Sequence, residues 1–151
     1  MREFFQRRVA MGTQFYQTYF ICLIGEAALD LGRAEEALAC ATDGLARASA
    51  TGEFFCEAEL HRLVARCRLA FDASDHEGAE SALQAALASA RARSAHLWEL
   101  RAGTDLARLW LERGRREEAR DLVSTIYGWF TEGFETPDLK DAKVLLDELA
   151  A

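Results

Sequence analysis

The amino-acid sequence predicts an all-α protein: an α-solenoid of three antiparallel helix pairs followed by a C-terminal capping helix. The hexapeptide Gly-Arg-Ala-Glu-Glu-Ala at 32–37 returns as Gly-Arg-Arg-Glu-Glu-Ala at 114–119, with a weaker copy between them. Ala37, Ala79 and Ala119 recur roughly every 40 residues, a period typical of helical repeats. Strong helix formers dominate the composition, and a single proline in 151 residues leaves long helices uninterrupted.

The first helix pair is predicted over residues 13–31 and 34–50. Thr13 is a suitable N-cap, and Gly32 and Gly52 are suitable residues for ending the two helices. Apolar residues recur at helical spacing, so each segment has one face that can be buried. These faces consist of Ile21, Ile24, Ala28 and Leu31 in the first helix and Ala37, Leu38, Ala41, Leu45 and Ala48 in the second.

The second pair is predicted over residues 54–71 and over a helix that begins after Ser74. Ser74 and Glu77 have the spacing of a capping box, in which the two side chains satisfy free backbone N–H groups at the helix start. The faces predicted to be buried are Leu60, Leu63, Val64 and Cys67 in the first of these helices and Ala79, Ala82, Leu83, Ala86, Leu87 and Ala90 in the second.

The third pair is predicted over residues 95–113 and 116–130, with Gly114 ending its first helix. The expected buried faces are Leu100, Gly103, Leu106, Ala107 and Trp110 in one helix and Ala119, Leu122, Val123 and Ile126 in the other.

A seventh helix is predicted to begin at Thr136-Pro137-Asp138. Threonine is a suitable cap, proline fits the first helical position, and aspartate stabilises the positive N-terminal end of a helix. We expect this helix to cover the open end of the preceding pair. Its apolar residues are Leu139, Ala142, Leu145, Leu146 and Leu149. The aromatic residues just before it are interpreted as part of the same plug, with a ligand-facing patch as the alternative: Tyr127, Trp129, Phe130 and Phe134.

The connections between the predicted helices are short, so helices that follow one another are expected to be antiparallel neighbours. Residues 13–151 are therefore predicted to form a single helical-repeat domain. Residues 1–12 carry several apolar side chains and lead directly into the repeats, and we interpret them as the remnant of a preceding helix or a linker. We therefore expect the chain to be part of a longer protein.

Charge and composition exclude several classes of function. The formal net charge is −7, which disfavours direct binding of nucleic acid. No apolar run is long enough for a membrane span, and the charged first residues are unlike a secretory signal. Cys22, Cys40, Cys56 and Cys67 lack the spacing of metal ligands and are interpreted as small buried apolar residues. These features predict a protein of the reducing cytoplasm.

Candidate catalytic groups are few and scattered. His61, His76 and His96 are not clustered as metal ligands would be. Cys67 and His61 are six residues apart, so on a helix they point to different faces. The glutamate pairs at 35–36 and 117–118 lie at predicted helix starts, where they complement the helix dipole. We therefore predict no metal, no cofactor and no enzymatic activity.

Each unit resembles a tetratricopeptide repeat when Gly32 and Gly114 are placed at the turn between its two helices. That family needs small residues where the two helices touch, and the unit lacks the family's closing proline and exceeds its usual length. The matching small residues are Gly25, Ala65 and Ala107 in the first helices and Ala37, Ala79, Ala119, Gly44 and Ala86 in the second, whereas Ile126 does not match. The resemblance implies a concave groove lined by the first helix of each pair.

A further resemblance covers most of the chain. The stretches at 57–63, 98–102 and 128–134 look like the C-terminal repeat region of large bacterial signalling proteins. Those proteins join an adenylate/guanylate cyclase or a winged-helix domain to an ATPase module and a repeat tail. The resemblance implies a sensing or scaffolding role and supplies no binding residues.

The candidate site consists of side chains that share the expected groove face of the first helices. They are Tyr19, Cys22, Glu26 and Asp30 on the first helix, Glu59, Arg62 and Arg66 on the third, and Arg101, Asp105, Arg108 and Glu112 on the fifth. The groove would be acidic at one end and arginine-rich further along. The alternative is that these groups form ion pairs between helices, each of which contributes little to stability.

The predicted function is a non-catalytic protein–protein interaction or sensory module of a bacterial signalling or transcription regulator. The alternatives are a receptor domain for a small carboxylate or sugar ligand, and a self-association module that forms a homo-oligomer. Because arginine binds carboxylates with two parallel hydrogen bonds, the predicted partner is a protein or acidic peptide segment, or a small carboxylate ligand. Neither nucleic acid nor a membrane is predicted as a direct partner.

Overall fold

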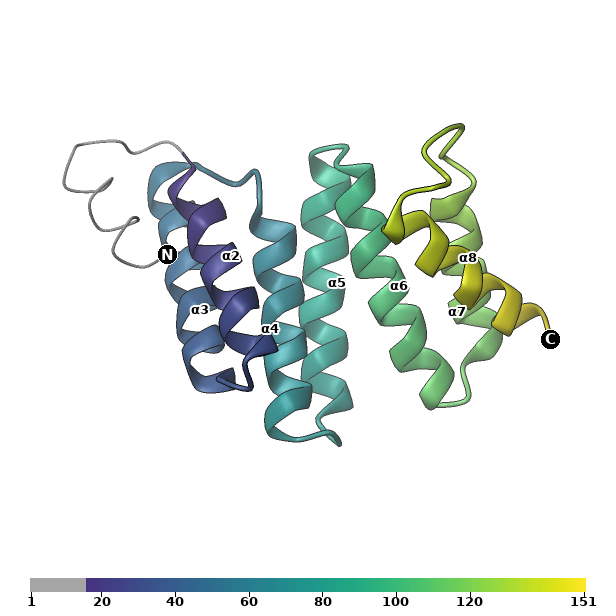
Figure 1. Cartoon of the computed structure of the whole chain (residues 1–151), viewed down its shortest axis with the longest axis horizontal. Coiled ribbons are helices and arrows are strands. Elements are labelled where there is room, and N and C mark those ends of the chain that lie inside the picture. The colour runs from purple at the N-terminus through teal and green to yellow at the C-terminus, as the bar shows by residue number, and fades with distance from the viewer. Residues whose placement is uncertain (1–15) are drawn as a thin grey trace.

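The computed structural model describes residues 16–151 of the chain. Within this range the protein is all-helical, with seven helices and no strand (Figure 1). The helices are α2 (Gln17–Asp30), α3 (Ala34–Thr51), α4 (Glu57–Phe71), α5 (His76–Ala92), α6 (His96–Glu112), α7 (Arg116–Tyr127) and α8 (Pro137–Ala150). The predicted N-cap Thr13 and the predicted remnant at residues 1–12 lie outside the described residues.

Four of these helices form a row. Each helix packs against the next one along the chain, and α4 also contacts α2 and α6, while α6 also contacts α8. The helices follow one another along the long axis of the molecule, from α2 and α3 at one end to α7 and α8 at the other (Figure 1). The row of α2, α4, α6 and α8 carries the candidate site.

The repeated Gly-Arg dipeptide forms the same turn twice. Gly32 and Gly114 have φ angles of 74° and 77°, a left-handed conformation that glycine adopts without a steric penalty. The N–H of Arg33 donates to the carbonyl of Ala28 at 2.9 Å, which closes α2. At the end of α6 the N–H of Arg115 donates to the carbonyl of Trp110 at 2.8 Å, which gives the same C-terminal motif. The predicted helix ends at both glycines are confirmed.

Small residues allow close contact between helices, as the sequence predicts. A methyl group added at Gly25 would lie 2.6 Å from Cδ2 of Leu63, and one added at Gly44 would lie 2.7 Å from Cδ2 of Leu60. The alanines predicted at helix contacts are fully buried: Ala37, Ala41, Ala48, Ala79, Ala86, Ala107 and Ala119. Because Gly25 and Gly44 carry no side chain, Leu63 and Leu60 of α4 pack directly against α2 and α3.

Two predicted helix boundaries are wrong. The helix predicted from residue 54 begins at Glu57, so Phe54 and Phe55 lie in the connection between α3 and α4. The helix predicted to end at residue 130 ends at Tyr127. Leu31, predicted to be buried, is 72% exposed because it lies at the C-cap of α2, in the turn before α3.

The predicted capping box at Ser74 is also wrong. Helix α5 begins one residue later, and the carboxylate of Asp75 accepts a hydrogen bond from the N–H of Gly78 at 3.0 Å. The hydroxyl of Ser74 donates instead to the carboxylate of Asp72 at 2.6 Å. Aspartate is as good an N-cap as serine, so the adjacent Asp75 takes this role.

Helix α8 closes one end of the core. It contacts both α6 and α7, and its apolar residues join the core cluster that contains Val123 and Ile126 of α7. The four buried residues that α8 contributes are Leu139, Ala142, Leu145 and Leu149. Of the aromatic residues before α8, Tyr127 and Phe130 pack against this core, whereas Trp129 is 58% exposed and stacks on His96.

Candidate binding groove

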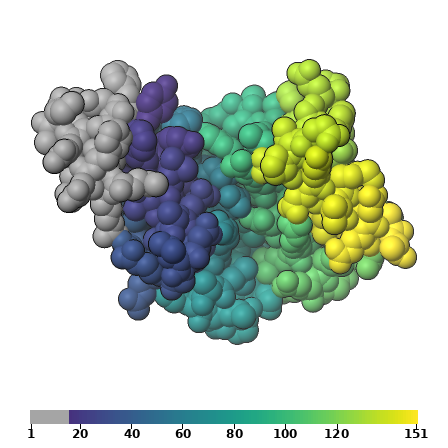
Figure 2. All heavy atoms as spheres, viewed as in Figure 1, coloured from purple at the N-terminus to yellow at the C-terminus, as the bar shows by residue number. Residues whose placement is uncertain are grey.

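The face between α2 and the start of α8 is hollowed (Figure 2). Two adjoining hollows lie along it, with volumes of about 580 Å³ and about 280 Å³. Glu26 of α2 and Arg101 of α6 line both of them, so the hollows form one groove across α2, α4 and α6. We call the larger the aromatic hollow and the smaller the polar hollow.

The aromatic hollow is lined mainly by apolar side chains, and five of its lining residues are aromatic. Tyr16, Tyr19, Phe20, Phe55 and Trp98 surround it, with Leu23 and Leu97 beside them and Glu26, Glu59 and Arg101 at its polar end. The ring centroids of Tyr19 and Phe55 are 5.7 Å apart, and those of Phe55 and Trp98 are 5.3 Å apart. These rings come from α2, from the connection before α4, and from the first turn of α6, so three consecutive units of the row build one aromatic wall.

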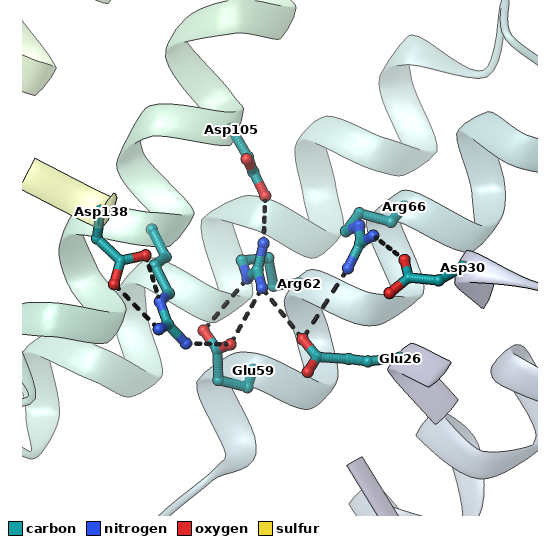
Figure 3. A network of polar contacts seen from close by, with 8 residues as sticks. Glu26, Asp30, Glu59, Arg62, Arg66, Asp105 and Asp138 are labelled. Atoms are coloured by element: carbon teal, nitrogen blue, oxygen red, sulfur yellow. Dashed lines mark hydrogen bonds and ion pairs between the residues drawn. The ribbon is translucent and has the colours of Figure 1, made fainter. Parts of the chain in front are cut away.

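Arg62 is the centre of the polar network (Figure 3). From α4 it donates to Asp105 of α6 at 2.9 Å and to Glu26 of α2 at 3.2 Å. It also donates from two nitrogens to Glu59 of its own helix, at 3.2 and 3.1 Å. One guanidinium therefore links three consecutive helices of the row.

A second arginine ties α6 to α8. Nε and Nη2 of Arg101 donate to the two carboxylate oxygens of Asp138 at 2.8 and 3.0 Å, and Nη1 donates to Glu59 at 3.3 Å. Asp138, predicted only to complement the helix dipole, thus also fixes the position of an arginine in the groove. Glu59 accepts from both arginines, and its side chain is 7% exposed.

Two outer pairs lie beside the centre of the network, and one of them is joined to it through Glu26. Arg66 donates to Asp30 at 3.2 Å and lies 3.9 Å from Glu26. Arg108 forms a two-pronged pair with Asp141 of α8 at 2.9 and 2.7 Å. Both pairs are more exposed than the pairs of Arg62, so each contributes less to stability.

Burial and neighbouring charges change the ionisation of the central groups. Burial raises the pKa of the Glu26 carboxyl, and the negative charge of Glu59 raises it further, although Arg62 acts in the opposite direction. Burial by itself lowers the pKa of Arg62, but the carboxylates of Glu59 and Asp105 outweigh this effect and raise it overall. At Glu26, burial together with repulsion from Glu59 therefore outweighs the effect of the neighbouring arginines on the pKa.

The structure brings together most of the predicted site residues. Tyr19 and Cys22 line the aromatic hollow, and the charged residues of α2 and α4 enter one connected network with Arg101 and Asp105. Arg108 lies further along the row with Asp141. Glu112 is exposed near the end of α6, and within the described residues no contact joins it to this network. The ion pairs between helices that the alternative interpretation predicted are present.

The aromatic lining was missed at Phe55 and Trp98, although the sequence carries a signal for it. Aromatic residues recur at the start of three helices in the row: Tyr16 and Tyr19 at α2, Phe55 before α4, and Trp98 in the first turn of α6. In a repeat array, equivalent positions of successive units lie side by side. Comparing these positions between repeats would have predicted a shared aromatic wall.

The thiols near the groove are poor nucleophiles. Burial raises the pKa of Cys22, which lines the aromatic hollow, and burial also raises that of Cys56 to about 11. Both thiols are therefore protonated at neutral pH, whereas nucleophilic attack needs the thiolate. Cys22, Cys56 and Cys67 are buried and free, as predicted for small apolar residues. Cys40, predicted to be buried as well, is free but only partly buried.

Two further features concern metal binding and the membrane. Within residues 16–151 no group of three or more His, Cys, Asp or Glu side chains has an arrangement that would hold a metal ion. Among the described helices, none combines the length and the apolar character needed to cross a lipid bilayer.

Comparisons with protein-family models, with curated proteins and with solved structures found no match to this chain. The functional conclusion therefore rests on the geometry and chemistry of the groove.

Proposed function

We propose that this chain is a non-catalytic interaction module that binds a segment of another protein in the groove across α2, α4 and α6. The single observation that carries the proposal is the continuity of the two hollows, which share Glu26 and Arg101. An extended peptide needs an elongated surface that offers both apolar and polar contacts. The aromatic hollow supplies the apolar contacts, and the polar hollow beside it supplies the polar ones.

The proposed architecture is a tetratricopeptide-like α-solenoid of three antiparallel helix pairs with α8 as its cap. The row of even-numbered helices, the identical turns after α2 and α6, and the fully buried alanines at the helix contacts support it. In such a stack the first helices line the binding face. Those helices are α2, α4 and α6, which carry the groove residues.

The proposed setting is a bacterial signalling or transcription regulator in the cytoplasm, with this chain as its sensory or scaffolding tail. The sequence resemblance to the repeat tails of cyclase–ATPase and winged-helix–ATPase proteins supports this setting. The protonated thiols and the carboxylates held by arginines are consistent with a module that has no catalytic activity.

A small-molecule receptor is the second candidate, and the size of the aromatic hollow favours it. Its volume of about 580 Å³ lies within the range of roughly 300–1,000 Å³ that small-molecule sites occupy. A ligand in this hollow would contact the rings of Tyr19, Phe55 and Trp98 and the carboxylate of Glu26.

Two screens separate these candidates. A thermal-shift screen against a metabolite panel should give no large stabilisation if the groove binds protein segments, because only a tight ligand of the native state raises the melting temperature substantially. A random 12-residue display library should yield binding peptides whose affinity falls at least tenfold with Tyr19→Ala. A metabolite that stabilises the protein, together with a library that yields no peptide, would favour the receptor.

A further inference from the structure

We infer that the partner segment places a lysine or arginine side chain, next to an apolar residue, in the aromatic hollow. The inference rests on the proposed function and names the chemistry of the partner. It reverses the sign expected from the arginine pattern, which predicts an acidic segment or a carboxylate ligand.

The rings supply the first argument. Trp98, Phe55 and Tyr19 lie with neighbouring centroids 5.3 and 5.7 Å apart and line one wall of the hollow. An ammonium or guanidinium group is attracted to the face of an aromatic ring, most strongly to tryptophan. The methylene stem of a lysine or arginine also packs well on apolar surface, while its charged end stays beside polar groups.

The balance of charge supplies the second argument. Six carboxylates lie in or directly beside the groove network, namely Glu26, Asp30, Glu59, Asp105, Asp138 and Asp141. The arginines that pair with them are Arg62, Arg66, Arg101 and Arg108. Among the described residues the network therefore carries two more negative than positive charges, and a cationic side chain would reduce that excess.

The position of Glu26 makes the excess negative charge accessible to a ligand in the groove. Glu26 lines both hollows, and its side chain is 26% exposed. Its contacts with Arg62 and Arg66, at 3.2 and 3.9 Å, are longer than the 2.8 Å contact between Arg101 and Asp138. Glu26 is thus the carboxylate placed to meet a cation that enters from the aromatic hollow.

The arginines, in contrast, are already engaged. Arg62 donates to three carboxylates, and Arg101 donates to Asp138 from two nitrogens and to Glu59 from a third. An acidic ligand would have to displace these intramolecular partners and leave them without a cation. The net charge of −7 would also repel an acidic segment and attract a basic one at long range.

The test is the residue composition of peptides selected from the 12-residue display library with the whole chain as bait. The inference predicts enrichment of lysine and arginine beside an aromatic or aliphatic residue. Enrichment of aspartate and glutamate would overturn the inference and leave the proposed function intact. A library that yields no peptide would contradict both.

Matched variants then locate the contact. For a selected peptide, replacing its lysine by norleucine should weaken binding about tenfold, the difference expected for a partly desolvated cation on a ring. Glu26→Gln should weaken the lysine peptide several-fold and leave the norleucine peptide unchanged. The control Glu132→Gln removes the same charge from an exposed loop between α7 and α8 and should change neither.

The aromatic contribution has its own pair of variants. Phe55→Leu and Trp98→Leu should each reduce affinity for the lysine peptide, with circular dichroism reporting an intact helical fold. The matched control Trp129→Leu alters a tryptophan that is 58% exposed and lies outside the hollow. This control should leave the affinity for the lysine peptide unchanged. Equal affinity of the peptide for wild type, Phe55→Leu and Glu26→Gln would overturn the inference. A competition experiment would also overturn it if an acidic peptide displaced the bound peptide and tetramethylammonium did not at any concentration.

Discussion

Arg62 is the residue whose removal should affect folding most strongly among the groove arginines. Its side chain is only 14% exposed and holds three carboxylates from three helices. Removing one partner of a buried ionic cluster is strongly destabilising because the remaining charges lose their compensation. Arg108, which is 40% exposed, forms a pair at the surface.

We therefore expect Arg62→Gln to lower the free energy of unfolding by about 3 kcal/mol, and Arg108→Gln to lower it by less than about 1 kcal/mol. Urea unfolding followed by circular dichroism measures both. Equal and small effects would show that the Arg62 cluster contributes no more to stability than a surface ion pair.

The residue types of the groove could be predicted from the sequence, but their pairing could not. Helical spacing alone predicts that Glu26, Arg62 and Arg101 lie on the groove face of the first helix of each pair. The bidentate contact between Arg101 and Asp138 depends on how α8 packs against α6, and that packing angle has no local signal. For the same reason Phe55 and Trp98 were missed, since their proximity arises only when consecutive units are stacked.

At the scale of single elements, the start of α5 depends on Asp75. The Asp75 carboxylate accepts from the Gly78 N–H, whereas the Ser74 hydroxyl is occupied by Asp72. The local sequence fits both residues as caps, so only the structure distinguishes them. Asp75→Ala should therefore destabilise the protein by about 1 kcal/mol. Ser74→Ala should have less than about half that effect. If thermal unfolding showed a larger loss of stability for Ser74→Ala than for Asp75→Ala, the capping box predicted at Ser74 would be correct after all.

Helix α8 begins where the signals in Thr136-Pro137-Asp138 predict it. Thr136 occupies the N-cap position, but its hydroxyl donates to the carbonyl of Gly133 and caps no N–H group of the helix. The packing surface of α8 is large: Leu139, Leu145 and Leu149 are buried in the core cluster that contains α7. Ending the chain after Gly133 would expose that core to water. We expect the truncated protein to melt roughly 10 °C or more below the full chain, and to aggregate.

The matched control for this truncation is the full chain with Val144→Ser, which changes an α8 residue that is 64% exposed. It should melt close to the wild-type temperature. A truncated protein that stays monomeric in light scattering and melts with the full chain would show that α8 is dispensable.

Across the whole molecule, α2, α4, α6 and α8 form one row in which each helix contacts the next. This arrangement explains why the aromatic wall and the polar network both cross three helices that are far apart in sequence. Composition and period predicted the helical architecture because both are properties of the repeat unit, and not of any single contact.

The most direct test of the proposed groove is a ¹H–¹⁵N NMR titration of the chain with a library-selected peptide. The account predicts that shifted amide signals cluster on α2, α4 and α6 around Tyr19, Glu26 and Phe55, together with the indole N–H of Trp98. Shifts confined to α3, α5 and α7, or an absence of shifts at saturating peptide, would contradict it.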